Sequence, residues 1–221
     1  MHLGIIPDGN RRYARNHRMR KKKAYRKATE VIADLGKKFR DSEIEEVTFY
    51  LLSEENLERD EEELETLFEL FRESIDELVE EFADNGFSVN WATTRPGAIP
   101  EELASKLREL EEKFDEGEKK VNLLISYSGK KDILEAAEEL KRRGEDFTEE
   151  NLGKALEITG SIDYVIRTGD NPDRECLSGF PIWNASYAEY YHIKKNFPGV
   201  TAEDVDDALE HFEHLRRNKG E

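Results

Sequence analysis

Short runs rich in β-branched and aromatic residues alternate with long stretches of helical spacing throughout this chain of 221 residues. The strand-like runs span residues 2–6, 47–52, 87–92, 121–126 and 164–167, with a weaker sixth at 187–193. Apolar residues recur every three or four positions between them, which predicts helices over 20–39, 61–84, 100–114, 130–143, 149–157 and 202–217. Because strands that alternate with helices indicate βαβ units, we expect a single α/β domain over residues 1–221, with a central, mostly parallel six-stranded sheet flanked by helices.

Charge is distributed unevenly along the chain. Asp and Glu number 51 against 34 Lys and Arg, a formal net charge of −17. Residues 11–27 nevertheless hold ten Lys or Arg and no acid, which leaves 24 basic against 51 acidic groups, or −27, on the rest of the chain. An acidic body repels nucleic acid, so we expect no nucleic-acid partner and interpret the basic segment as a local anion site.

Two further features limit where such a chain works. No apolar run approaches the roughly 18 residues that a membrane span needs, and no signal-like apolar stretch follows a basic start. Cys176 is the one cysteine, which excludes an internal disulfide and a cysteine-rich metal site. We therefore expect a cytoplasmic protein.

The segment IIPDGNRRYAR, residues 5–15, carries the first candidate site. An apolar strand stops there and a basic, helix-compatible stretch begins, and such a turn exposes backbone N–H groups that favour phosphate. Arg11, Arg12 and Arg15 would add charge-assisted hydrogen bonds. Asp8 has two interpretations: a helix cap or salt-bridge partner, or a ligand for a Mg²⁺ that is held jointly with a phosphate.

Four more segments complete a recognisable series. The five are HLGIIPDGNRRYA (2–14), FYLLSEENLER (49–59), VNLLISYSGKKDI (121–133), IDYVIRTGD (162–170) and LSGFPIWNASYAEYYH (177–192). In order and spacing they resemble the signature segments of the cis-prenyltransferases, the family of undecaprenyl diphosphate synthase, over nearly the whole chain. The resemblance implies a homodimer that uses Mg²⁺ to ionise or displace an allylic prenyl diphosphate and condense it with isopentenyl diphosphate into a cis-polyprenyl diphosphate. Its lipid product would also bring the protein to a membrane surface.

The same resemblance implies roles for individual residues. Catalytic roles fall on Asp8, Asn10 and Ser53. Asp8 and Glu189 would be the metal carboxylates, with Glu189 reaching across the dimer. Substrate binding falls on Gly9, Arg11, Arg12, Tyr13, Lys21, Asn56, Arg59, Arg167, Arg174 and Ser178. The apolar faces of stretches 20–39 and 61–84 would line a tunnel for the growing chain; ordinary core packing is the alternative.

The chain departs from the family pattern in its basic segment and before Ser178. Lys21 replaces the usual arginine, and the loop after Arg167 is longer, with Cys176 where a second arginine is usual and added acids at Asp170 and Asp173. These changes leave the acceptor open. Isopentenyl diphosphate is the first interpretation, and the alternative is a second prenyl diphosphate, a prenyl alcohol or a phosphorylated lipid. A non-catalytic partner subunit of the same fold is a less favoured interpretation.

Overall fold

The computed structural model describes residues 1–171 and 176–219. Its six strands form one sheet in the order β3-β4-β2-β1-β5-β6, and each neighbouring pair is parallel. The strands are β1 (His2–Ile6), β2 (Glu46–Ser53), β3 (Phe87–Ala92), β4 (Lys119–Tyr127), β5 (Tyr164–Thr168) and β6 (Glu189–Ile193). All six lie where the sequence predicts them, and the sheet is parallel throughout rather than mostly so.

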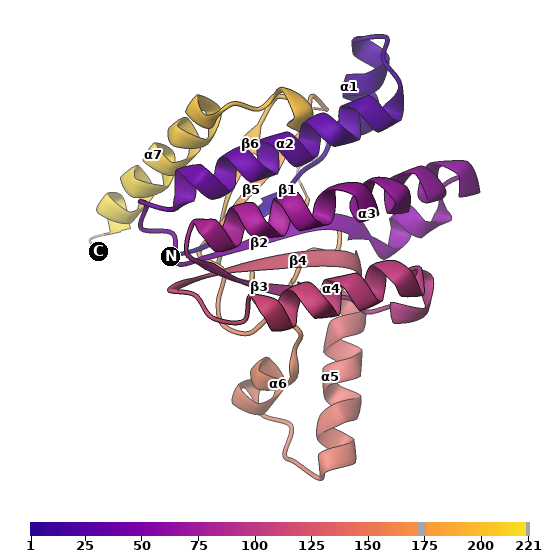
Figure 1. Cartoon of the computed structure of the whole chain (residues 1–221). Helices are drawn as coiled ribbons and strands as arrows, with labels where there is room; N and C mark the ends of the chain where they lie inside the picture. The colour runs from indigo at the N-terminus through magenta and orange to yellow at the C-terminus, as the bar shows by residue number, and fades with distance from the viewer. Residues whose placement is uncertain (172–175, 220–221) are drawn as a thin grey trace.

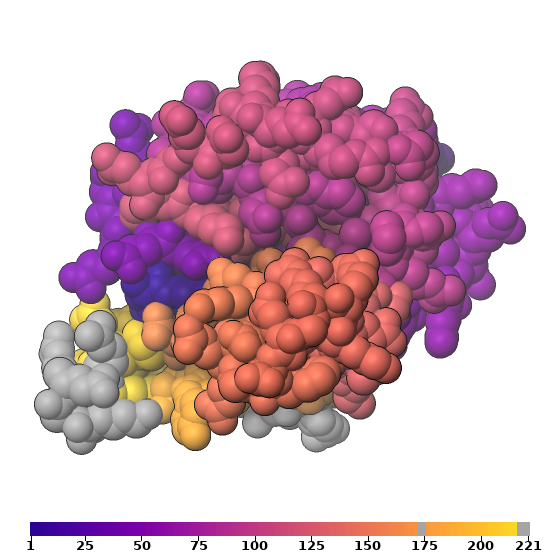
Figure 2. Space-filling view, turned by 90° about the horizontal axis from the view of Figure 1, so that it is seen from below, coloured from indigo at the N-terminus to yellow at the C-terminus, as the bar shows by residue number. Residues whose placement is uncertain are grey.

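The helices form a thick layer over one face of the sheet and a projection on the other side (Figure 1). The layer contains α2 (Lys21–Phe39), α3 (Glu61–Asp84), α4 (Glu101–Lys113) and α7 (Ala202–Lys219). The projection contains α5 (Gly129–Arg143) and α6 (Glu149–Ala155), and it stands out in orange when the molecule is viewed from below (Figure 2). A short helix, α1 (Asn10–Asn16), precedes α2. No helix within the described ranges is both long and apolar enough to cross a bilayer.

Alternation along the strands divides the buried side chains between the two faces of the sheet. Leu3 and Ile5 of β1 belong to the larger core beneath the helical layer, with Phe49 of β2. Ile6 belongs to a smaller core with Phe180 on the other face. Successive side chains of a strand point to opposite faces of the sheet, so each strand contributes to both cores. A shift by one residue would exchange the two sets of side chains, and this burial therefore fixes the register of the sheet.

The chain order creates a switch point beside β1. From β1 the chain crosses to β2 on one side, whereas β5 pairs with β1 on the other side. In open parallel sheets, ligands bind outside the carboxyl ends of the strands at such a point. Asp8 follows β1, Ser53 ends β2 and Arg167 lies next to the end of β5, so the predicted site residues meet there.

Candidate active site

A cavity of about 520 Å³ opens at the carboxyl ends of β1, β2 and β5. Ten of the predicted site residues line it: Asp8, Gly9, Asn10, Arg11, Arg12, Ser53, Asn56, Arg59, Arg167 and Ser178. The remaining wall is largely apolar, with Ala28 and Ile32 from α2 and Leu67, Leu70 and Phe71 from α3. The cavity is therefore divided into a cationic part and an apolar part, and the predicted faces of α2 and α3 supply the latter.

Asp8 is held between two arginines. The Arg167 guanidinium, which is only 2% exposed, donates to Asp8 Oδ2 at 2.7 Å, and Arg12 lies 3.4 Å from Asp8 Oδ1. Burial alone would raise the pKa of Asp8, but the hydrogen bond from Arg167 and the two positive charges outweigh burial and lower it. Asp8 is thus an ionised carboxylate at neutral pH.

The turn after Asp8 has a shape that only glycine fits. Gly9 has φ of 102°, and a β-carbon there would lie 2.2 Å from Oδ1 of Asn196 and 2.9 Å from its Cα. Asn10 then donates from Nδ2 to the Pro7 carbonyl at 3.1 Å. Its Oδ1 is buried, and no group in the described part of the chain donates to it. An unpaired buried acceptor beside Asp8 is suited to a cation or a ligand donor.

Arg12 is shared by two carboxylates. Its Nε lies 2.7 Å from Asp170 Oδ1, while its terminal nitrogen faces Asp8. Asp170 also accepts from Asn196 Nδ2 at 2.8 Å and Asn16 Nδ2 at 3.2 Å. Asp170, which departs from the family pattern, therefore partly neutralises the charge of Arg12.

Ser53, Asn56 and Arg59 form a chain of hydrogen bonds along the cavity wall. The short helix η1 (Glu54–Glu58) lets Asn56 Nδ2 donate to Ser53 Oγ at 2.7 Å, and Arg59 donates to Asn56 Oδ1. Arg59 also donates to the hydroxyl of Tyr25 at 3.3 Å. Burial, with the nearby Glu63 carboxylate, raises the pKa of Tyr25 to about 12, so this side chain is a neutral phenol. These contacts fix the Arg59 guanidinium in place.

Glu63 anchors this group of cations and is absent from the predicted set. Its carboxylate, 3% exposed, binds Lys21, accepts from the Tyr25 hydroxyl at 3.0 Å and lies 3.5 Å from Arg59. Arg11 approaches it at 3.9 Å. Burial would raise the pKa of Glu63, but the hydrogen bonds from Lys21 and Tyr25 and the charge of Arg59 lower it. Three acids open α3, but Glu63 lies four residues before Leu67 and seven before Leu70, so helical spacing places it on the buried face and could have indicated it.

Three predicted residues lie outside the cavity lining, and a fourth is not described. Tyr13 is buried against α2, where its hydroxyl accepts from Lys27 at 2.8 Å. Lys21 binds Glu63 behind the wall. Glu189 starts β6 and pairs with the first residue of β5, so within one chain it lies at the opposite end of the sheet from Asp8. Arg174 lies outside the described residues.

The residues at Asp8 fit a magnesium ion that is completed by a ligand. Mg²⁺ prefers oxygen and is usually held by one or two carboxylates together with phosphate oxygens. Asp8 supplies an ionised carboxylate, and Asn10 supplies the unpaired buried oxygen. Among the described residues, no group of three or more His, Cys, Asp or Glu side chains would hold a metal by itself.

Comparison with known proteins finds relatives over the full chain. A family profile described as "Putative undecaprenyl diphosphate synthase" matches residues 6–220. An isoprenyl transferase of Campylobacter jejuni is 30% identical over 99% of this chain and 97% of its own length. A tritrans,polycis-undecaprenyl-diphosphate synthase (geranylgeranyl-diphosphate specific) of Pyrobaculum aerophilum is 31% identical over 99% and 95%. The crystal structure of lavandulyl diphosphate synthase from Lavandula x intermedia with dimethylallyl diphosphate shares the fold, with a TM-score of 0.84 and 24% identity over 96% of this chain and 94% of that one.

Proposed function

Because this chain belongs to the undecaprenyl diphosphate synthase family and is therefore a prenyltransferase, we propose that it condenses an allylic prenyl diphosphate with isopentenyl diphosphate into a cis-polyprenyl diphosphate. One observation carries the proposal: a single cavity is cationic at one part of its wall and apolar at the other. A prenyl diphosphate has the same division, with a charged head and a hydrocarbon tail.

The cationic part suits the leaving group of this reaction. When an allylic C–O bond breaks, negative charge develops on the diphosphate and positive charge on the carbon. Arg11, Arg12 and Arg59 line this part of the cavity, and prearranged guanidinium groups stabilise such charge as it forms. The chain of contacts from Glu63 through Tyr25 holds Arg59 in position before substrate arrives.

The apolar part suits the hydrocarbon tail. Ile32, Leu67 and Phe71 give the tail an apolar wall, and they keep water from the cation-like carbon, which water would otherwise quench. We propose that this pocket between α2 and α3 is the start of the predicted tunnel.

Asp8 would hold the Mg²⁺, with Asn10 beside it. When bound, the ion supplies Lewis-acid stabilisation of the charge on the leaving diphosphate. Arg12 and Arg167 also contact the Asp8 carboxylate, so they would lie beside the ion. The homodimer stays a prediction, and in it Glu189 of the partner subunit would approach this site. The cytoplasmic location also stays a prediction.

Arg167 and Ser178 form the proposed acceptor site. One terminal nitrogen of Arg167 donates to Ser178 Oγ at 2.7 Å and to the Cys176 carbonyl, and the other donates to Asp8. Arg167 therefore links Ser178 to Asp8. The thiol of Cys176 lies 3.3 Å from Ser178 Oγ, where a second arginine is usual in the family. This departure from the family pattern supports, as a second candidate, a different acceptor: a second prenyl diphosphate, a prenyl alcohol or a phosphorylated lipid.

Mass spectrometry of the products distinguishes the two candidates. Donors from dimethylallyl to geranylgeranyl diphosphate are incubated with Mg²⁺, with and without isopentenyl diphosphate. We expect products longer by five-carbon units, formed only when isopentenyl diphosphate is present. Products formed without it, by joining a second prenyl diphosphate, an alcohol or a phosphorylated lipid, would favour the other acceptor. Absence of any product and of diphosphate release would indicate a non-catalytic subunit.

Asp170→Asn should strengthen donor binding. The substitution removes the charge that competes for Arg12 but leaves an oxygen to accept from its Nε. We expect KM for the donor, and Kd for inorganic pyrophosphate, to fall about threefold, a modest change because the Asp170 side chain is 37% exposed and water screens its charge. Steady-state kinetics and calorimetry measure both values. Asp115→Asn, an exposed acid away from the cavity, is the matched control. A rise in KM would show instead that the charge of Asp170 is needed to hold Arg12.

A further inference from the structure

Residues 11–27, here called the basic arm, form a small unit of their own. The arm comprises α1, the turn after it and the first two turns of α2, and it stands at one corner of the molecule beyond the sheet (Figure 1). Tyr13, Ala14 and Ala24 form its own small core, Tyr13 stacks on His17 at 4.0 Å, and Lys27 donates to the Tyr13 hydroxyl. The arm is therefore an ordered surface that presents its cations in fixed positions.

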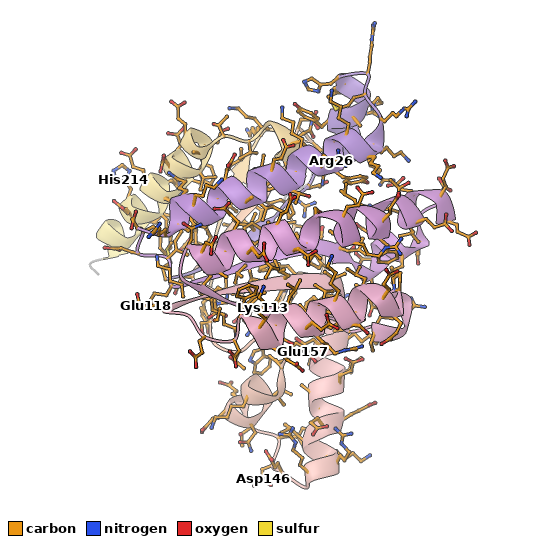
Figure 3. All side chains as sticks on the ribbon, in the orientation of Figure 1. Arg26, Lys113, Glu118, Asp146, Glu157 and His214 are labelled. Carbon is orange, nitrogen blue, oxygen red and sulfur yellow. The ribbon has the colours of Figure 1, made fainter. Side chains whose placement is uncertain are left out.

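Half of the ten cations on the arm have no acidic partner. Lys21, Lys22 and Arg26 form ion pairs with α3, and Arg26, which is labelled on α2 in Figure 3, lies 3.1 Å from Glu73. Arg11 and Arg12 face the cavity. The other five are exposed, and no carboxylate of the described residues lies within 4.0 Å of them: Arg15, Arg18, Arg20, Lys23 and Lys27.

This arrangement is unfavourable for the isolated protein. The positive end of the α2 dipole carries three consecutive lysines, Lys21 to Lys23, and no acid lies in its first turn. Arg20 occupies the N-cap without a side-chain cap, and Arg18 has φ of 51°, in the left-handed region. Lys23 and Lys27 lie four residues apart on α2, where like charges face each other and repel. An anionic partner that spreads over the arm would relieve this repulsion.

We propose that the basic arm docks on an anionic lipid surface. The rest of the chain carries −27, so a charged plane would repel the body and attract this corner. Nucleic acid fits less well, because the two tyrosines of the arm, Tyr13 and Tyr25, are buried and offer no ring for a base to stack on. Arg11 and Arg15 also line the cavity, so docking by the arm would bring the cavity mouth to the lipid.

Flotation with lipid vesicles tests the proposal on the purified full chain without substrate. We expect binding to phosphatidylcholine vesicles that contain phosphatidylserine or phosphatidylglycerol, little binding to phosphatidylcholine alone, and release as salt rises. In the triple variant Arg18→Glu/Arg20→Glu/Lys23→Glu, the binding constant should fall at least a hundredfold, since each cation contributes about fivefold near such a surface. Inorganic phosphate at matched ionic strength should not compete.

The controls separate this proposal from the catalytic one. Arg40→Glu/Arg95→Glu/Lys141→Glu makes the same change in net charge at exposed cations outside the arm, and it should retain binding. The arm variant should keep kcat/KM with a short, water-soluble donor, because its three residues do not line the cavity, and Asp8→Asn should bind vesicles like the wild type. Equal loss in both triple variants, no binding by the wild type, or tighter binding to duplex DNA than to vesicles would each overturn the proposal.

Discussion

Asp8→Ala should reduce diphosphate release from an allylic donor by at least about a thousandfold. Asp8 is the carboxylate that we propose holds Mg²⁺ in this cavity, and it also contacts Arg167 and Arg12. The effect should appear in kcat, measured with saturating donor, isopentenyl diphosphate and Mg²⁺. Binding of inorganic pyrophosphate without Mg²⁺ should be retained or tighter, because the substitution releases both guanidiniums for the anion. Full turnover by Asp8→Ala would contradict the role assigned to this residue.

Asp8→Asn is the matched control for folding. The amide oxygen keeps the acceptor for Arg167, so the variant should fold, but it should unfold below the wild-type temperature because the buried Arg167 loses the charge of its partner, and it should lose most of its turnover. The pH dependence has a defined sign. Since the pKa of Asp8 is lowered in the folded protein, its ionisation stabilises the fold above the usual Asp value near 3.9, and this contribution is lost as pH falls through the lowered value.

Glu63→Gln should have the second largest effect, on both stability and donor binding. It removes the negative charge from a buried carboxylate that faces Lys21, Arg59 and Arg11. Breaking a buried pair costs about 3–5 kcal/mol, and we expect the lower end because the Lys21 side chain is half exposed and can turn to water. Thermal unfolding should therefore begin roughly 10 °C lower. KM for the donor should rise more than kcat falls, because Arg59 loses part of its anchor.

Glu61→Gln is the control for this substitution. Glu61 is exposed and lies in the same first turn of α3. Its replacement by Gln alters the interaction with the helix dipole in the same way, but it removes no contact with the cations around Glu63. Its unfolding temperature should move by only a degree or two. Equal shifts in the two variants would show that Glu63 acts through the helix end and not through the cations. An unchanged KM in Glu63→Gln would remove the positioning role.

Local patterns predict the elements of this fold because each element is buried in a characteristic way. The strand β4 is mostly apolar and is buried at every position from Val121 to Tyr127, as a parallel sheet covered on both faces requires, and α3 shows its apolar stripe at helical spacing. The cavity residues that follow strand ends, such as Asp8 and Arg167, were also predictable, because parallel strands end at one edge. The family resemblance supplied the individual roles.

The remaining features depend on contacts between distant segments. Asn196 shapes the turn at Gly9, Asp170 binds Arg12 and Glu63 binds Lys21, and in each case the partner is many residues away. Tyr13, in contrast, was predicted to bind substrate but lies outside the cavity lining. It lies within the phosphate-loop signature, but the period of α1 turns it toward α2 while Arg11 and Arg15 face the cavity.

The central position of β1 has a consequence for how the chain is made. β1 pairs on one side with β2, but its other edge waits for β5, whose Arg167 lies 159 residues after Asp8. A nascent chain therefore holds an open, hydrophobic strand edge until most of its length has been synthesised, and such edges recruit other chains. The same delay postpones the contact between Asp8 and Arg167, and with it the completion of the cavity, until β5 has been made.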